Sequence, residues 1–158
     1  MGLIKLETKI NQTPEICFDL SRSIDLHMES AISTDEKAIE GVTSGLMSLD
    51  DEVLWEAKHF GISWNLRVKI SKFDRPNYFQ DSQVEGIFKF FNHDHFFIEE
   101  NGATLMKDEF HFECPFGIAG YFADPIVTGH MKKFLSNRNQ IIKKVAEGEQ
   151  WEKYLYQL

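Results

Sequence analysis

A long amphipathic segment near the end of the sequence restricts the fold more than any other feature. Asp124 is a good N-cap, Pro125 suits the first helical position, and Gly148 suits the stop after the last turn. The apolar residues between them recur at helical spacing: Val127, Met131, Phe134, Ile141 and Val145. The pattern predicts one helix of roughly 23 residues. Its apolar face needs a sheet to pack on, because most of the preceding sequence has strand character.

A first hairpin is predicted around Phe60-Gly61, which suits a two-residue loop between residues 52–59 and 62–71. This loop sets four cross-strand pairs: His59 with Ile62, Ala57 with Trp64, Trp55 with Leu66, and Val53 with Val68. All of these side chains then share one face of the sheet, and the charged side chains share the other. Because the register from the turn agrees with the apolar pattern, we expect the paired residues on the core face.

A second hairpin is predicted around Asn101-Gly102, because Asn-Gly is the strongest short turn signal. It joins residues 87–99 to residues 104–112. The register pairs Phe97 with Met106, His95 with Asp108, and His93 with Phe110, and it places Phe91 and Phe112 on the same face. The core face of this hairpin therefore contains a histidine directly opposite an aspartate.

The remaining segments complete an α+β fold. A strand is expected at 3–10, short helices after Thr13-Pro14 and from Ser23, and further strands at 37–42 and 78–84. The register of 78–84 stays open. Phe79 and Asp81 share one face of this strand, and a two-residue or a three-residue loop at Glu85-Gly86 would turn that face to opposite sides of the sheet. We predict a curved antiparallel sheet of about seven strands wrapped around the long helix, with two short helices after the first strand. The gap between sheet and helix is where a small ligand would bind.

The chain is expected to form a single domain over residues 1–158, with residues 149–158 as a C-terminal extension. Trp151, Tyr154, Leu155 and Leu158 fall at helical spacing in this extension. The apolar stripe would pack either on its own domain or on a second subunit, so a homodimer is one of two arrangements that the sequence allows.

Composition limits the partners. The formal net charge is -8, and the basic residues gather only on the polar face of the last helix, which argues against nucleic acid. The two cysteines lie far apart and lack metal-binding spacing, and no apolar run is long enough for a membrane span. We expect a cytoplasmic protein with reduced thiols, no membrane insertion and no cofactor. The 14 Phe residues supply material for a core or an apolar pocket.

Several strings resemble the START-like helix-grip superfamily, which includes polyketide cyclases, dehydratases, lipid-transfer domains and small bacterial ligand-binding proteins. They are Phe18-Asp19-Leu20-Ser21-Arg22, Trp55-Glu56-Ala57-Lys58-His59-Phe60-Gly61, Phe73-Asp74-Arg75-Pro76 and Pro115-Phe116-Gly117. With the His93/His95 strand and the last helix, the resemblance covers residues 3 to 147. It implies the same fold and a pocket for a small molecule. It carries no catalytic motif over to this chain.

Three polar features on the predicted core face are candidates for chemistry. His95 with Asp108 is the candidate catalytic pair, because a carboxylate fixes the tautomer of an imidazole and stabilises its charged form; the alternative is a polar pair that satisfies itself in the core. His93 and His95 point the same way, but a metal site needs a further ligand such as His59 or Asp108, and we predict none. Arg138 either projects into the cavity to hold a carboxylate or carbonyl, or extends past the rim to water.

The preferred function is binding or transport of a small hydrophobic or aromatic molecule between the sheet and the last helix. The residues expected to contact it are Trp55, His59, Trp64, Leu66, Phe91, His93, His95, Phe97, Met106, Asp108, Phe110, Met131, Phe134 and Arg138. One alternative is a cyclase- or dehydratase-like enzyme that uses His95 and Asp108. A second alternative is an interaction domain whose pocket is vestigial and whose tail is the contact surface.

Overall fold

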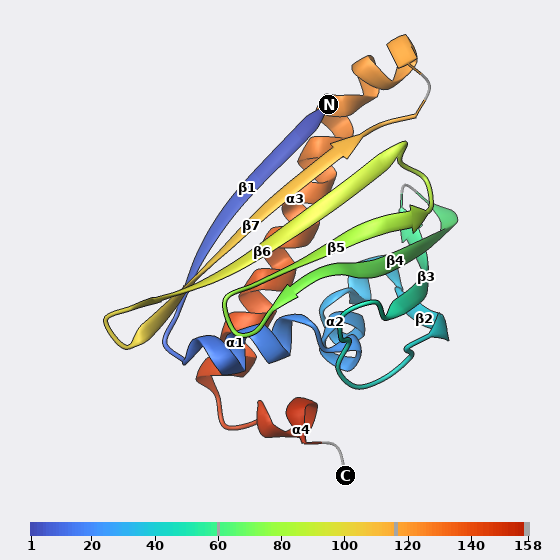
Figure 1. Cartoon of the computed structure of the whole chain (residues 1–158). Helices are drawn as coiled ribbons and strands as arrows, with labels where there is room; N and C mark the ends of the chain where they lie inside the picture. The colour runs from blue at the N-terminus through green and yellow to red at the C-terminus, as the bar shows by residue number, and fades with distance from the viewer. Residues whose placement is uncertain (60, 116, 157–158) are drawn as a thin grey trace.

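The computed structural model describes residues 1–59, 61–115 and 117–156, and it leaves the side chains of residues 59 and 117–124 undescribed (Figure 1). The elements follow one another in the order β1 (Gly2–Ile10), α1 (Pro14–Ser21), α2 (Ile24–Ser30), a 3-10 turn (Ile32–Thr34), β2 (Lys37–Gly41), β3 (Glu52–His59), β4 (Ile62–Asp74), β5 (Tyr78–Glu85), β6 (Phe90–Glu100), β7 (Ala103–Glu113), α3 (Gly117–Glu147) and α4 (Glu152–Leu155).

One antiparallel sheet holds the seven strands in the order β1-β7-β6-β5-β4-β3-β2. The sheet curves, and α3 runs along its concave side, with α1 and α2 below one end (Figure 1). The predicted α+β helix-grip architecture is therefore confirmed, including the two short helices after the first strand. The N-cap of the second short helix is also as predicted, because the Ser23 hydroxyl accepts a hydrogen bond from the backbone N–H of Leu26.

Both predicted hairpin registers are confirmed. Trp55 lies opposite Leu66 on β3 and β4, and His95 lies opposite Asp108 on β6 and β7. Asn101 and Gly102 both adopt positive φ angles, of 53° and 79°, which the tight turn between β6 and β7 requires. The open register of β5 is settled too, since Asp81 pairs with His93 and so faces the concave side.

The predicted start of the long helix is wrong. Helix α3 begins at Gly117, so Asp124 is not its N-cap and Pro125 lies inside it. A proline ring usually disrupts a helix interior, which is why Asp124-Pro125 suggested a beginning; here the helix continues through it. The predicted end is confirmed, because α3 stops at Glu147 and the Gly148 amide donates to the Val145 carbonyl.

Helix α1 covers one end of the concave face. Phe18 is fully buried and meets Phe73, Phe79 and Phe97 edge to face, with ring centroids 5.2–5.3 Å apart. Met106 is also fully buried, with its sulfur 3.6 Å from the Ser21 hydroxyl. This end of the sheet is therefore closely packed core over the described residues.

Two of the strings that carry the family resemblance meet at Asp19. Its carboxylate accepts hydrogen bonds from Nη2 of Arg22 and from Nη2 of Arg75, both at 2.7 Å. Arg22 also lies over the rings of Phe18 and Phe73. The cluster ties α1 to the turn between β4 and β5. Burial acts to raise the pKa of Asp19, but the hydrogen bonds from the two arginines outweigh it and the pKa is lowered.

This cluster predicts a loss of stability in acid. Because the folded pKa of Asp19 lies below its unfolded value, its contribution to the free energy of unfolding is present above about pH 4 and disappears as the pH falls through the folded pKa. We expect Asp19→Asn to cost about 1–3 kcal/mol near neutral pH, with the difference from wild type shrinking below about pH 4. Urea unfolding at a series of pH values measures this difference. The exposed Asp74 supplies the control, and an equal pH dependence in Asp74→Asn would contradict the assignment.

The C-terminal extension packs on its own domain. Tyr154 of α4 is 4 % exposed and its hydroxyl donates to the carboxylate of Glu29 on α2. Trp151 and Leu155 pack against the core beside it. Of the two arrangements that the sequence allows, the structure has the intramolecular one over the described residues; Leu158 lies outside them, and the homodimer stays a prediction.

The sheet has two edges, β1 and β2. Strand β1 runs beside α3, where Lys143 donates to the Lys9 carbonyl and Glu147 accepts from the Asn11 amide. Strand β2 is short, and its pairing with β3 shifts register between Ala38 and Glu40. None of the helices, over the described residues, has both the length and the apolar character needed to span a membrane.

Candidate functional site

A cavity of about 350 Å³ lies between the concave face of the sheet, α2 and α3. Most of its wall is apolar, with aromatic side chains from the sheet and Val127, Met131 and Phe134 from α3. The ring of His27 on α2 stacks at 4.4 Å from Trp55 at the same wall. The cavity occupies the part of the concave face that α1 leaves uncovered.

Nine of the predicted contact residues line this cavity. They are Trp55, Trp64, Leu66, Phe91, His93, Phe110, Met131, Phe134 and Arg138. Trp64 differs from the expectation in one respect, because it remains 39 % exposed although it faces the cavity. It lies near the end of the β3–β4 hairpin, where the sheet extends beyond the packed core.

Four predicted residues lie outside the lining. Phe97 and Met106 are buried beneath α1, and His95 and Asp108 are buried behind the wall, with His95 fully inaccessible. These four do not line this cavity, and contact between them and a ligand stays a prediction. The physical reason is that the apolar alternation along a strand is the same at the end of the sheet that α1 covers and at the end that borders the cavity. The side chain of His59 lies outside the described residues.

A polar cluster interrupts the apolar wall where β5, β6 and β7 lie side by side. Nε2 of His93 is 2.9 Å from Oδ1 of Asp108, a hydrogen bond between buried groups. Nδ1 of His95 lies 3.0 Å from the same oxygen, but the ring is not oriented for a hydrogen bond to it. The other oxygen of Asp108 accepts from the amide nitrogen of Asn139 on α3 at 2.6 Å. Asp108 thus links both histidines to the long helix.

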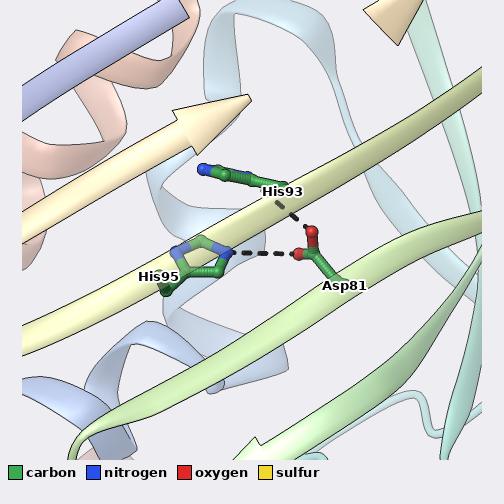
Figure 2. A group of neighbouring side chains, drawn as sticks. All are labelled: Asp81, His93 and His95. Carbon is green, nitrogen blue, oxygen red and sulfur yellow. Dashed lines mark hydrogen bonds and ion pairs between the residues drawn. The ribbon is translucent and has the colours of Figure 1, made fainter. Parts of the chain in front are cut away.

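The second carboxylate of this cluster is Asp81, which lines the cavity together with His93. Its oxygens face Nδ1 of His93 at 3.7 Å and Nε2 of His95 at 3.5 Å (Figure 2). The imidazole of His95 lies between two rings, with centroids 4.2 Å from Phe79 and 3.8 Å from His93. Each histidine therefore has one nitrogen toward Asp81 and the other toward Asp108.

Burial and charge set the protonation of the cluster. Burial acts to raise the pKa of both carboxyls, but the two histidines outweigh it, so the pKa of Asp81 is lowered and that of Asp108 falls well below its usual value. Burial acts to lower the pKa of His95, yet Asp108 and Asp81 raise it overall. The pKa of His93 is lowered by burial and by the adjacent His95. The two imidazoles are thus unequal.

Arg138 is buried rather than extended past the rim, with 5 % exposure, and it lines the cavity. Its Nη2 donates to the Ser21 carbonyl at 2.7 Å, which fixes the guanidinium between α3 and α1. Its Nη1 has no hydrogen-bond partner among the described residues. Of the two alternatives for Arg138, the structure therefore has the inward one.

Sequence reasoning missed Asp81 and Asn139. The sequence leaves the register of β5 open, because two loop lengths at Glu85-Gly86 are compatible with it, and the two irregularities in the pairing with β4 have no sequence signal. One signal was available: Phe79 needs a buried face, and Asp81, two residues further, shares that face. Asn139 follows Arg138 on a helix and gives no signal in the sequence, because its role depends on where Asp108 lies.

Comparisons with known proteins identify the fold. No family model matches the sequence, and no curated protein matches it. Among solved structures, TTHA0849 from Thermus thermophilus aligns with a TM-score of 0.70 and 14% identity, covering 89% of this chain and 97% of that one. A START superfamily protein from Mycobacterium smegmatis gives 0.69 and 9%, covering 92% and 97%.

A plant structure aligns over a similar length. Ginseng major latex-like protein 151 from Panax ginseng gives a TM-score of 0.64 and 14% identity, covering 93% of this chain and 98% of that one. At sequence identities this low, the similarity supports a shared fold and no shared function. Together with the curved seven-stranded sheet around α3, they establish that this protein has the START-like helix-grip fold.

Proposed function

We propose that the protein binds a small apolar or aromatic molecule that carries a carboxylate or carbonyl group. The observation that carries this proposal is the guanidinium of Arg138, which is buried in an apolar cavity wall with one nitrogen unpartnered among the described residues. A buried donor without an acceptor costs free energy. A ligand oxygen at Nη1 supplies that acceptor, while the aromatic wall contacts the apolar body.

The cavity volume suits a small molecule. An apolar cavity of about 150 Å³ accommodates one benzene molecule, so the 350 Å³ here correspond to a ligand of about two rings. This volume argues against the alternative of a vestigial pocket. The enzyme alternative is weakened, because neither His95 nor Asp108 lines the cavity.

Binding of 1-anilinonaphthalene-8-sulfonate tests the proposal, because this fluorescent probe joins two aromatic groups to an anion. We expect Arg138→Met to weaken its binding about tenfold or more, since a hydrogen bond to a charged group contributes about 1.5–3 kcal/mol. Fluorescence titration measures the affinity, and circular dichroism melts show whether the variant stays folded. Native mass spectrometry of freshly purified protein searches for a natural ligand.

Two controls make the titration specific. Arg67 pairs with Glu40 outside the cavity lining, so Arg67→Met is expected to bind the probe like wild type. The neutral 1-anilinonaphthalene lacks the anion and is expected to bind wild type and Arg138→Met equally. Equal binding of the anionic probe by wild type and folded Arg138→Met would contradict the proposal, as would no binding by wild type.

A further inference from the structure

The spacing between Asp81 and the two histidines is unusual for a purely hydrogen-bonded cluster. Nδ1 of His93 and Nε2 of His95 face the carboxylate of Asp81 at 3.7 and 3.5 Å (Figure 2). Strong bonds between nitrogen and a carboxylate oxygen are about 2.7–2.9 Å long. His95 and Asp81 make only a long hydrogen bond of 3.5 Å, and His93 stays 3.7 Å from Asp81, although neighbouring contacts of the same cluster reach 2.6 and 2.9 Å.

The 3.5 and 3.7 Å distances lie slightly above the spacing of ligands around a shared cation. Nitrogen and oxygen ligands about 2.0–2.1 Å from a tetrahedral Zn²⁺ ion lie roughly 3.3–3.4 Å from each other. One candidate ligand atom from each of Asp81, His93 and His95 lies within 4.8 Å of the other two. Two imidazoles and one carboxylate form a donor set that transition metals favour over Mg²⁺ or Ca²⁺.

The outer side of the cluster has the arrangement that supports metal-binding histidines. Such histidines usually turn their second ring nitrogen toward a carboxylate, which fixes the ring and its tautomer. Asp108 lies 2.9 Å from Nε2 of His93 and 3.0 Å from Nδ1 of His95, so one carboxylate faces the second nitrogen of both rings. Asn139 in turn holds Asp108 in place.

The charges of the cluster are also suited to a cation. Oδ1 of Asp81 is buried and has no hydrogen-bond partner among the described residues. Arg138 lies nearby, but its guanidinium donates a hydrogen bond to the Ser21 carbonyl rather than to Asp81. Two carboxylates, Asp81 and Asp108, therefore lie around the histidines, against the single guanidinium of Arg138.

We propose that Asp81, His93 and His95 bind one divalent transition-metal ion of the Zn²⁺ type at the wall of the cavity. Asp81 and His93 line the cavity and His95 is buried behind them, so the remaining coordination positions face the cavity. From the sequence alone, the further ligand would be His59 or Asp108, and we predict no metal. In the structure, the register of β5 places Asp81 opposite His93, so the third ligand is Asp81 instead. The site does not depend on the ligand proposed for Arg138.

Metal titration of the full chain without a polyhistidine tag tests this site. After treatment with a chelator and its removal, calorimetry with Zn²⁺ is expected to show one bound ion per chain. Co²⁺ is expected to give the visible absorption band of a low-coordinate nitrogen and oxygen site. We expect Asp81→Asn to weaken Zn²⁺ binding at least tenfold, and His95→Gln to weaken it similarly if that buried variant folds.

The matched control is His111→Gln, which removes a partly exposed histidine from the opposite face of β7 and should leave Zn²⁺ binding unchanged. Asp81→Asn keeps the test decisive if His95→Gln unfolds, because Asp81 is partly exposed and lies at the cavity. Absence of stoichiometric binding by wild type would overturn the proposal. Equal affinity in wild type and folded Asp81→Asn would overturn it as well, since the metal would then bind elsewhere.

Discussion

Replacing Asp108 by alanine is expected to lower the free energy of unfolding by about 3–5 kcal/mol, because breaking a buried charged pair leaves its partners uncompensated. Asp108 is 1 % exposed, so its removal leaves the imidazole of His93 and the amide of Asn139 without their acceptor and His95 without the carboxylate 3.0 Å away. Urea unfolding in the presence of a chelator measures this cost independently of metal binding.

The neighbouring residue provides the control for Asp108. Glu109 lies on the opposite face of β7 and pairs with the exposed Lys5, so Glu109→Ala is expected to change stability by no more than about 1 kcal/mol. A cost below about 1 kcal/mol for Asp108→Ala would show that the contact between Asp108 and Asn139 contributes little to the packing of α3 on the sheet.

Phe18→Ala is expected to cost about 3–5 kcal/mol, the range for deleting a fully buried aromatic ring. Phe18 is inaccessible and contacts three other rings, and the closely packed core around it leaves a cavity when the ring is removed. Chemical unfolding followed by fluorescence and circular dichroism measures the loss.

Phe134→Ala is the contrasting variant. Phe134 is only partly buried and borders the existing cavity, so its removal enlarges an open space rather than creating a new one. We expect a cost of about 1 kcal/mol or less, together with weaker binding of the fluorescent probe. Equal destabilisation by the two alanine substitutions would mean that Phe134 belongs to the closed core.

The parts of the fold that local chemistry determines were predictable from the sequence. Asn101-Gly102 dictates a tight turn, and the apolar alternation on both sides confirms the register that brings His95 opposite Asp108. The start of α3 was not predictable, because a proline gives the same local signal at a helix beginning as inside a continuous helix.

The candidate site was predicted only in part, because its members come together through long-range contacts. His93 and Arg138 were identified, since each places a polar group on an apolar face. Asp81 was not, because the sequence allows two lengths for the loop after β5 and so does not decide which face of the sheet Asp81 shares. The burial of His95 depends on rings from other strands, such as Phe79 of β5. The residue pattern of β6 alone does not show these neighbours.

The two sheet edges determine how the protein behaves when it is concentrated. An open antiparallel sheet exposes free backbone groups at its outer strands, and long flat edges promote strand-by-strand aggregation. Here Lys143 and Glu147 of α3 bind the Lys9 carbonyl and the Asn11 amide at the end of β1, and β2 is short and irregular. The short, irregular β2 therefore offers a poorer template for a further strand than β1, so addition of a second chain to the sheet would occur more readily beside β1.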